Sequence, residues 1–202
     1  SWFISGIVMI YHSFPRVSQE ERFARQQALG TASLPAMQDV LRRLPADVRP
    51  GGISLDNPEG QNVFHFGNRR KSHDLYADTN AVAPTVNYAL CEWRAKNWCP
   101  NNNITRVDTL HALDQWIPLA HNKRELPVYK FFYDGPEGYQ LYISSRSGNI
   151  LQFTDSDKRF WAWFGAIPHW VYFTVIRENQ NLWTRFMYWS CYLGMFMCFT
   201  GF

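Results

Sequence analysis

The segment LPVYKFFYDGPEGYQLYISSRSGNILQF, residues 126–153, decides the fold, because two turn signals divide it into three strand-like runs. The turn signals are DGPEG, at Asp134–Gly138, and Ser147-Gly148, since glycine and proline interrupt regular strands. The runs between them are rich in aromatic and β-branched residues, which are typical of strands. We therefore predict three strands that form an antiparallel meander.

A helix is predicted immediately before this meander, over residues 106–118 (RVDTLHALDQWIP). Leu110, Leu113 and Ile117 recur at the spacing of one helical face. Pro118 is expected to end the helix, because proline has no amide hydrogen with which to continue it.

The same order of helix and strands is predicted earlier in the chain. Residues 33–45 (SLPAMQDVLRRLP) are predicted to form an amphipathic helix, and residues 51–80 three strands with turns at 57–60 and 67–68. At an offset of 65 to 66 residues, Val63-Phe64 corresponds to Val128-Tyr129 and Leu75-Tyr76 to Leu141-Tyr142. We interpret this as an internal duplication. We expect the two units to pack together and form an α+β fold.

The charged side chains are very unevenly distributed. Residues 1–15 carry none, and residues 160–202 carry only Arg177, Glu178 and Arg185 out of 37 in the chain. The net charge of +3 is nearly balanced, which gives no electrostatic reason to expect nucleic acid as a partner. The central part is therefore predicted to be polar and the two ends apolar.

The two ends are predicted to be parts of transmembrane helices. A complete span needs roughly 20 apolar residues, so we expect residues 1–15 to be the end of one helix and residues 159–202 to be an interfacial segment and the start of the next. The chain would then be a fragment; the alternative is a soluble protein with two buried core helices. Tryptophan and tyrosine favour the level of the lipid headgroups. The expected membrane anchors are Trp161, Trp163, Trp170, Tyr172, Trp183 and Trp189.

These patterns resemble the PepSY-associated transmembrane protein family. In that family a helix and a short antiparallel meander end in an aromatic residue and a turn of the form D-x-x-T/S-G. The second unit has LYISSRSGNIL, with Ser144 at the place of the aspartate, and the first has LYADTNAV, with Asn80 at the place of the glycine. The aromatic segment RFWAWFGAIPHWVYFTVIRENQNLW resembles the family's return to the membrane.

The resemblance implies a bacterial inner-membrane protein with residues 16–158 on the periplasmic side. Residues 16–104 would be the first PepSY-like unit with a linker, and residues 105–158 the second. In an oxidising periplasm Cys91 and Cys99 can pair as a disulfide. Cys191 and Cys198 are expected to be buried thiols in the apolar C-terminal run.

Some members of this family reduce ferric siderophores and hold haem with transmembrane histidines. The resemblance therefore makes His12 and His169 tentative ligands of haem b, since imidazole is a good axial ligand for haem iron. On this interpretation the protein would be a ferric reductase-like oxidoreductase that acts in iron uptake. The alternative is that both rings simply lie at the membrane interface among tryptophan and tyrosine.

A second class of function stays open. No P-loop, dinucleotide fingerprint, nucleophile elbow or HExxH motif is present in the sequence. On this second hypothesis the polar part is a binding or regulatory module that is anchored in the membrane. It would hold a peptide or a periplasmic partner protein on an open sheet. His65 alternates with Phe64 and Phe66, which predicts that its ring points to the opposite face of that sheet.

Overall fold

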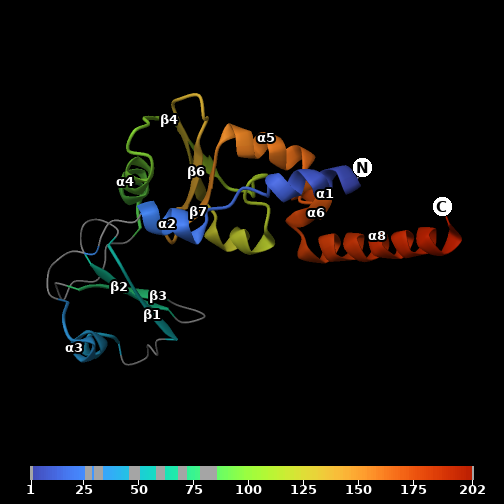
Figure 1. The fold of residues 1–202 in the computed structure, drawn as a ribbon. Helices are drawn as coiled ribbons and strands as arrows, with labels where there is room; N and C mark the ends of the chain where they lie inside the picture. The colour runs from blue at the N-terminus through green and yellow to red at the C-terminus, as the bar shows by residue number, and fades with distance from the viewer. Residues whose placement is uncertain are drawn as a thin grey trace. The chain divides into compact units, whose positions relative to one another are not determined.

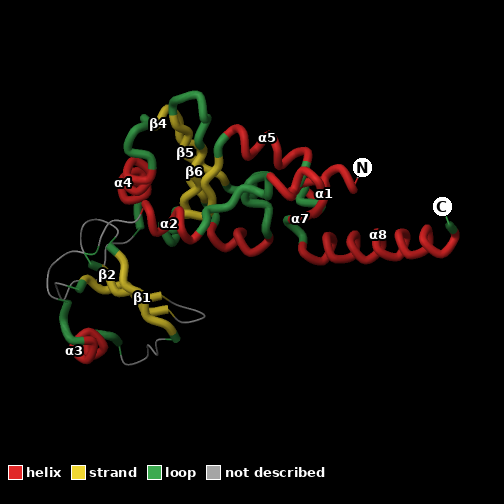
Figure 2. The backbone as a smooth tube through the Cα atoms, viewed as in Figure 1, coloured by secondary structure: helices red, strands yellow, loops and turns green. Residues whose placement is uncertain are grey.

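A computed structural model describes residues 2–25, 29, 34–45, 51–57, 62–67, 72–77 and 86–201. The chain divides into two compact units, one formed by residues 19–85 and the other by residues 1–18 together with 86–202. Figures 1 and 2 show the elements of each unit. We describe each unit by itself.

The unit of residues 19–85 contains a three-stranded antiparallel sheet of order β1-β2-β3. Its elements are α2 (Gln19–Arg25), α3 (Met37–Arg42), β1 (Gly52–Asp56), β2 (Val63–Gly67) and β3 (Ser72–Tyr76). Val40 of α3 packs with Phe64, Phe66 and Leu75 in a buried cluster. The predicted helix and the three predicted strands are confirmed, whereas residues 58–60 and 68 of the predicted turns lie outside the described residues.

The other unit contains a four-stranded antiparallel meander of order β4-β5-β6-β7. The strands are β4 (Ile104–Leu110), β5 (Val128–Tyr133), β6 (Gln140–Ser144) and β7 (Ile150–Thr154). The three strands predicted over residues 126–153 are confirmed. The helix predicted over residues 106–118 is wrong, because that segment begins within β4. Its β-branched residues pair with β5, and Val107 lies opposite Phe131.

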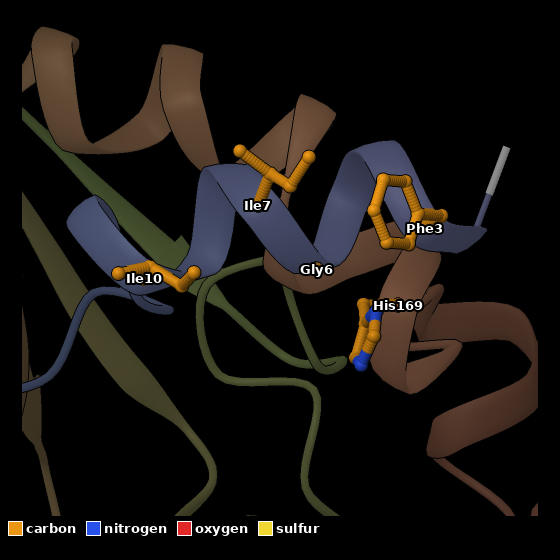
Figure 3. A pocket seen from close by; sticks show the side chains of 5 residues that line it. All are labelled: Phe3, Gly6, Ile7, Ile10 and His169. Atoms are coloured by element: carbon orange, nitrogen blue, oxygen red, sulfur yellow. The ribbon is translucent and has the colours of Figure 1, made fainter.

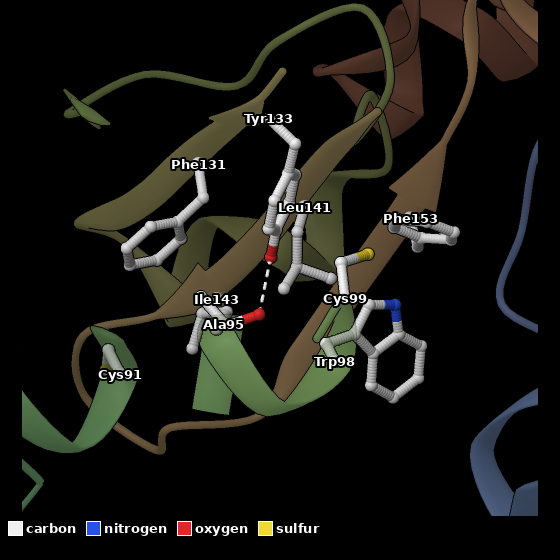
Figure 4. Packing of buried hydrophobic residues seen from close by; sticks show 9 residues of the cluster. All are labelled: Cys91, Ala95, Trp98, Cys99, Phe131, Tyr133, Leu141, Ile143 and Phe153. Carbon is white, nitrogen blue, oxygen red and sulfur yellow. Dashed lines mark hydrogen bonds between the residues drawn. The ribbon is translucent and has the colours of Figure 1, made fainter. Parts of the chain in front are cut away.

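The helix that covers this meander is α4 (Tyr88–Trp98), which comes before β4 in the chain. The Asn87 side chain caps it by accepting a hydrogen bond from the backbone N–H of Leu90 at 2.9 Å. Figure 4 shows Ala95 and Trp98 of α4 packed on the sheet. The hydroxyl of Tyr133 donates to the carbonyl oxygen of Ala95 at 2.8 Å, which joins the sheet to the helix.

Short helices and a loop cover the opposite face of the same sheet. They are α5 (Ser156–Phe164) and α6 (Ala166–Trp170), together with Trp116 and Ile117 from the loop after β4. Helix α1 (Trp2–Tyr11) packs against α5 and α6. The buried Gln152 amide donates to the carbonyl oxygens of Pro15 and Trp116, at 2.5 and 2.9 Å, and so ties the segment after α1 to the sheet. The remaining elements are η1 (Ala120–Glu125), α7 (Thr174–Arg177) and α8 (Gln180–Thr200).

The prediction of flanking transmembrane helices is wrong. Among the described residues, no helix has both the length and the apolar character needed to cross a bilayer. Helix α1 has 10 residues, whereas a span needs roughly 20. Helix α8 has 21 residues, but they include Arg185 and several other polar side chains.

The two units repeat the order of one helix followed by an antiparallel meander. In β2 and β3, Phe64 lies opposite Leu75 and packs with Val40 of α3. In β5 and β6, Phe131 lies opposite Leu141 and packs with Ala95 of α4. Phe64 therefore corresponds to Phe131 rather than to Tyr129, because each of these two phenylalanines lies opposite a leucine of the next strand and packs with the helix of its unit.

Candidate functional site

The largest unexplained feature is an apolar surface on the helices of the second unit. We use the name apolar surface for the exposed large apolar side chains of α1, α5 and α8. Its residues are Phe3, Ile4, Ile7, Ile10, Tyr11, Phe160, Trp163, Phe164, Leu182, Phe186, Tyr188, Trp189, Tyr192, Leu193, Met195, Phe196, Met197 and Phe199. Soluble monomers rarely expose a continuous apolar area larger than a few hundred Å². The exposed apolar side chains of α8 follow one another along a single helix, so we expect at least this part of the surface to need a partner that covers it.

Helix α8 contributes most of this surface. None of its residues is buried, and Trp189 and Phe199 are 75% and 91% exposed. Figure 1 shows α8 extending away from the sheet of its own unit. After Arg185 the helix carries no charged side chain, and a helical stretch that is apolar on every side is normally buried in a protein core or in lipid. Cys191 and Cys198 lie on this helix and are exposed, so the expectation that they are buried is wrong for the isolated chain.

The six aromatic residues predicted as membrane anchors fall into two groups. Trp163, Trp170 and Trp189 are exposed. The other three, Trp161, Tyr172 and Trp183, are partly buried and make specific contacts. Tyr172 packs edge-on against Phe14, and the Trp183 indole donates to the carbonyl oxygen of Trp170 at 3.1 Å. The second group therefore holds the helices in place, while the first is available to a partner.

His12 directly follows α1, and His169 lies beside the middle of that helix. The His12 ring stacks on Trp161, with centroids 4.7 Å apart and planes 12° apart. His169 Nδ1 is 3.2 Å from the Ser5 hydroxyl oxygen. Ser5 and His12 are seven residues apart, or roughly 10 Å along a helix, whereas two nitrogen ligands of one metal ion lie within about 4 Å of each other. This separation along α1 does not favour one haem iron between the two imidazoles, and haem ligation by His12 or His169 stays a prediction.

An open groove of about 420 Å³ runs along one side of α1 beside His169, as Figure 3 shows. It is lined by Phe3, Gly6, Ile7, Ile10 and His169. His169 packs directly against α1, since a Cβ at Gly6 would lie 3.4 Å from His169 Cε1, in van der Waals contact with the ring. The groove is part of the apolar surface and adds one polar ring to it.

The predicted pairing of Cys91 with Cys99 does not fit the structure. Cys91 lies in α4 and Cys99 caps the end of that helix. Eight residues of helix span about 12 Å, which exceeds the Cα separation of roughly 7 Å that a disulfide can bridge. Both residues are buried thiols.

A partly buried polar cluster lies on the face of the sheet that α5 and α6 cover. The Asp114 carboxylate accepts hydrogen bonds from Lys130 Nζ and from the Tyr142 hydroxyl, each at 2.7 Å. Burial alone raises the pKa of the Asp114 carboxyl, but these two hydrogen bonds outweigh it and hold the pKa below its ordinary value. Burial and the neighbouring Asp114 carboxylate raise the pKa of Tyr142.

Sequence reasoning missed this cluster. The meander predicts that Lys130 and Tyr142 can be neighbours, and they are register partners on β5 and β6. Asp114 could not be placed, because it lies in the loop after β4, where a helix was predicted. The next residue, Gln115, donates to the carbonyl oxygen of Tyr172 at 2.7 Å and accepts from the Thr174 hydroxyl at 3.0 Å. The cluster therefore connects the sheet to the start of α7.

The sheet of the first unit has one polar face, as predicted. His65 points away from Phe64 and Phe66, and its Nδ1 lies 2.8 Å from Asp74 Oδ1 on the neighbouring strand. The described residues contain no group of three or more histidine, cysteine, aspartate or glutamate side chains that could hold a metal ion.

Comparison of the chain with protein-family models, with curated proteins and with solved structures finds no match.

Proposed function

We propose that this chain is a PepSY-like binding module that attaches to a lipid bilayer through the apolar surface. The observation that carries the proposal is α8, a helix of 21 residues with no buried residue and several exposed aromatic rings. Lipid is favoured over a protein partner because tryptophan and tyrosine accumulate where headgroups meet acyl chains. In addition, residues 160–202 carry only three charged side chains.

The PepSY-like part of the proposal rests on the repeated order of helix and meander. Two units of this kind, each with a phenylalanine–leucine pair beneath its helix, support a duplicated binding domain. Both faces of the four-stranded sheet are covered, so a partner would not lie on an open sheet there as predicted. A peptide or partner protein can instead use the polar face of β1–β3 or an edge strand such as β4.

Vesicle flotation tests the attachment directly. We expect the full chain to float with phosphatidylcholine vesicles in a density gradient, whereas aggregates would sink. Phe199→Asp should lower the partition coefficient about tenfold, because burial of one aromatic side chain contributes about 1.5–3 kcal/mol and 1.4 kcal/mol corresponds to a factor of ten.

Phe23→Asp is the matched control, because Phe23 is also an exposed phenylalanine on a helix, 68% exposed, but lies in the other unit. We expect Phe23→Asp to float like the wild type. The proposal fails if the wild-type chain stays at the bottom of the gradient, or if the two substitutions weaken flotation equally.

A further inference from the structure

Arg177 is held in a fixed position at the bend between α7 and α8. Its guanidinium carbon lies 4.4 Å from the ring centroid of Trp183 and 5.4 Å from that of Tyr172. Its Nη1 donates to the side-chain oxygen of Gln180. Tyr172 is itself fixed, because its carbonyl oxygen accepts the hydrogen bond from Gln115. An arginine that is already ordered loses less conformational entropy when it binds a ligand.

The guanidinium has one donor for which the described residues provide no acceptor. The Nε–H of Arg177 is buried and meets no acceptor within the part of the chain that the structure describes. A buried donor without a partner costs about 1–3 kcal/mol, and in native structures such a group usually has a water or an ion as its partner. The adjacent carboxylate does not fill this role, because Glu178 lies 3.8 Å from Lys123 Nζ and pairs with it.

The charge around Arg177 favours an anion. Among the described residues Glu178 pairs with Lys123, and no ion pair joins it to the guanidinium of Arg177. A guanidinium binds phosphate through charge-assisted hydrogen bonds, and its planar shape distinguishes it from the ammonium group of lysine. A lipid phosphate is favoured over a soluble one because the α8 part of the apolar surface begins five residues later, at Leu182. In a bilayer the phosphates lie at the level that tryptophan and tyrosine occupy.

We propose that Arg177, held between Tyr172 and Trp183, binds the phosphate of an anionic phospholipid headgroup. This inference rests on the proposed attachment to lipid and adds to it a specific headgroup contact. Arg177 would then set the depth and orientation of α8, because the headgroup fixes one end of the helix at the interface.

Binding to two vesicle compositions separates this proposal from simple attachment. We expect the wild-type chain to bind vesicles of phosphatidylcholine with phosphatidylglycerol more tightly than vesicles of phosphatidylcholine alone. Arg177→Gln should lower the affinity for the anionic vesicles about fivefold, since one basic residue near such a surface contributes about 1 kcal/mol. Its affinity for phosphatidylcholine alone should change little.

Arg185→Gln is the matched control, because Arg185 is an exposed arginine of α8 that carries the same charge. If Arg185→Gln and Arg177→Gln reduce anionic binding equally, the effect is general electrostatics and the site is overturned. Arg177→Lys keeps the charge but not the planar fork, so we expect it to recover less than half of the lost affinity. Full recovery would also overturn the site. Circular dichroism should show that each variant keeps the wild-type fold.

Failure of the inference can be distinguished from failure of the proposed function. If the chain binds phosphatidylcholine but shows no preference for the anionic vesicles, the proposed attachment stands and the proposed headgroup site is wrong. If the chain binds neither composition, both the proposed attachment and the proposed headgroup site are wrong. Inorganic phosphate at millimolar concentration is the competitor that identifies the source of the anion. If it abolishes the Arg177-dependent preference, the site takes free phosphate and the lipid assignment is wrong.

Discussion

At the scale of single residues, Asp114 joins a strand, a neighbouring strand and a loop through one carboxylate. Its carboxylate accepts from Lys130, Tyr142 and the backbone N–H of Gln115. We expect Asp114→Ala to lower the free energy of unfolding by about 3 kcal/mol, because Lys130 and Tyr142 lose their acceptor while they stay largely buried. Denaturant unfolding of the full chain measures this. Asp108→Asn is the control and should cost less than about 0.5 kcal/mol, because its ion pair with Arg106 is exposed. Equal losses in the two variants would contradict the role given to the cluster.

The same carboxylate predicts how stability depends on pH. The pKa of Asp114 is lower in the folded chain than its ordinary value, because Lys130 and Tyr142 stabilise the charged form against the effect of burial. Its contribution to stability is therefore present above the ordinary pKa of an aspartate, about 3.9, and is lost as the pH falls through the lower folded value. Asp114→Asn should flatten the decline of the unfolding free energy in this acidic range. A variant that declines as steeply as the wild type would show that other carboxylates are responsible.

At the scale of elements, Gly165 determines how closely α1 packs against the junction of α5 and α6. A Cβ at this position would lie 3.0 Å from Val8 Cγ1 and 3.4 Å from the His12 carbonyl oxygen. We expect Gly165→Ala to destabilise the chain by about 1–3 kcal/mol, because a packed junction must shift. Gly194→Ala is the matched control, since a Cβ there meets nothing within 4 Å. It should be neutral or stabilising, because alanine favours a helix over glycine by up to about 1 kcal/mol. Thermal unfolding of both variants measures the difference, and equal shifts would contradict this packing.

The strands were more predictable from the sequence than the helices. Phe131, Tyr133 and Leu141 lie in runs of strand-forming residues separated by glycine turns, and local pattern is sufficient for such hairpins. Helix α4 was missed, although Asn87 is a good N-cap and Cys91, Ala95 and Trp98 recur at i, i+4 and i+7. Charged residues lie between these positions, so the apolar stripe of the helix is not evident from the sequence alone. The helix predicted over 106–118 failed because pairing with β5 outweighs the local helical spacing.

The candidate site was predictable only in part, for a related reason. The absence of charge and the excess of aromatic residues after residue 160 point to an apolar surface without any knowledge of the fold. The positions of individual rings depend on contacts between distant segments. Trp161 stacks on His12, and Trp183 lies against Arg177. No local pattern predicts such pairs, so anchors and packing residues could not be separated from the sequence.

At the scale of the whole molecule, the chain combines a packed sheet with helices that leave a large apolar area exposed. A stable protein interface needs about 800 Å² per partner, and one aromatic side chain can bury about 150–250 Å². Helix α8 alone exposes six aromatic rings, namely those of Phe186, Tyr188, Trp189, Tyr192, Phe196 and Phe199. Even partial burial of these rings reaches the area of a stable interface. The chain is therefore not expected to stay monomeric in water without lipid.

This argument predicts that the state of association depends on detergent. Size-exclusion chromatography with light scattering should show large assemblies of the full chain at micromolar concentration in plain buffer, because burial of the apolar surface drives association. A mild detergent above its critical micelle concentration should reduce the protein mass to that of one chain. Replacing Trp189, Phe196 and Phe199 together by glutamate should have much the same effect without detergent, while unchanged circular dichroism shows that the fold is kept. A wild-type chain that is monomeric in plain buffer would mean that its helices pack together in solution and cover the apolar surface, and the basis for lipid attachment would then be lost.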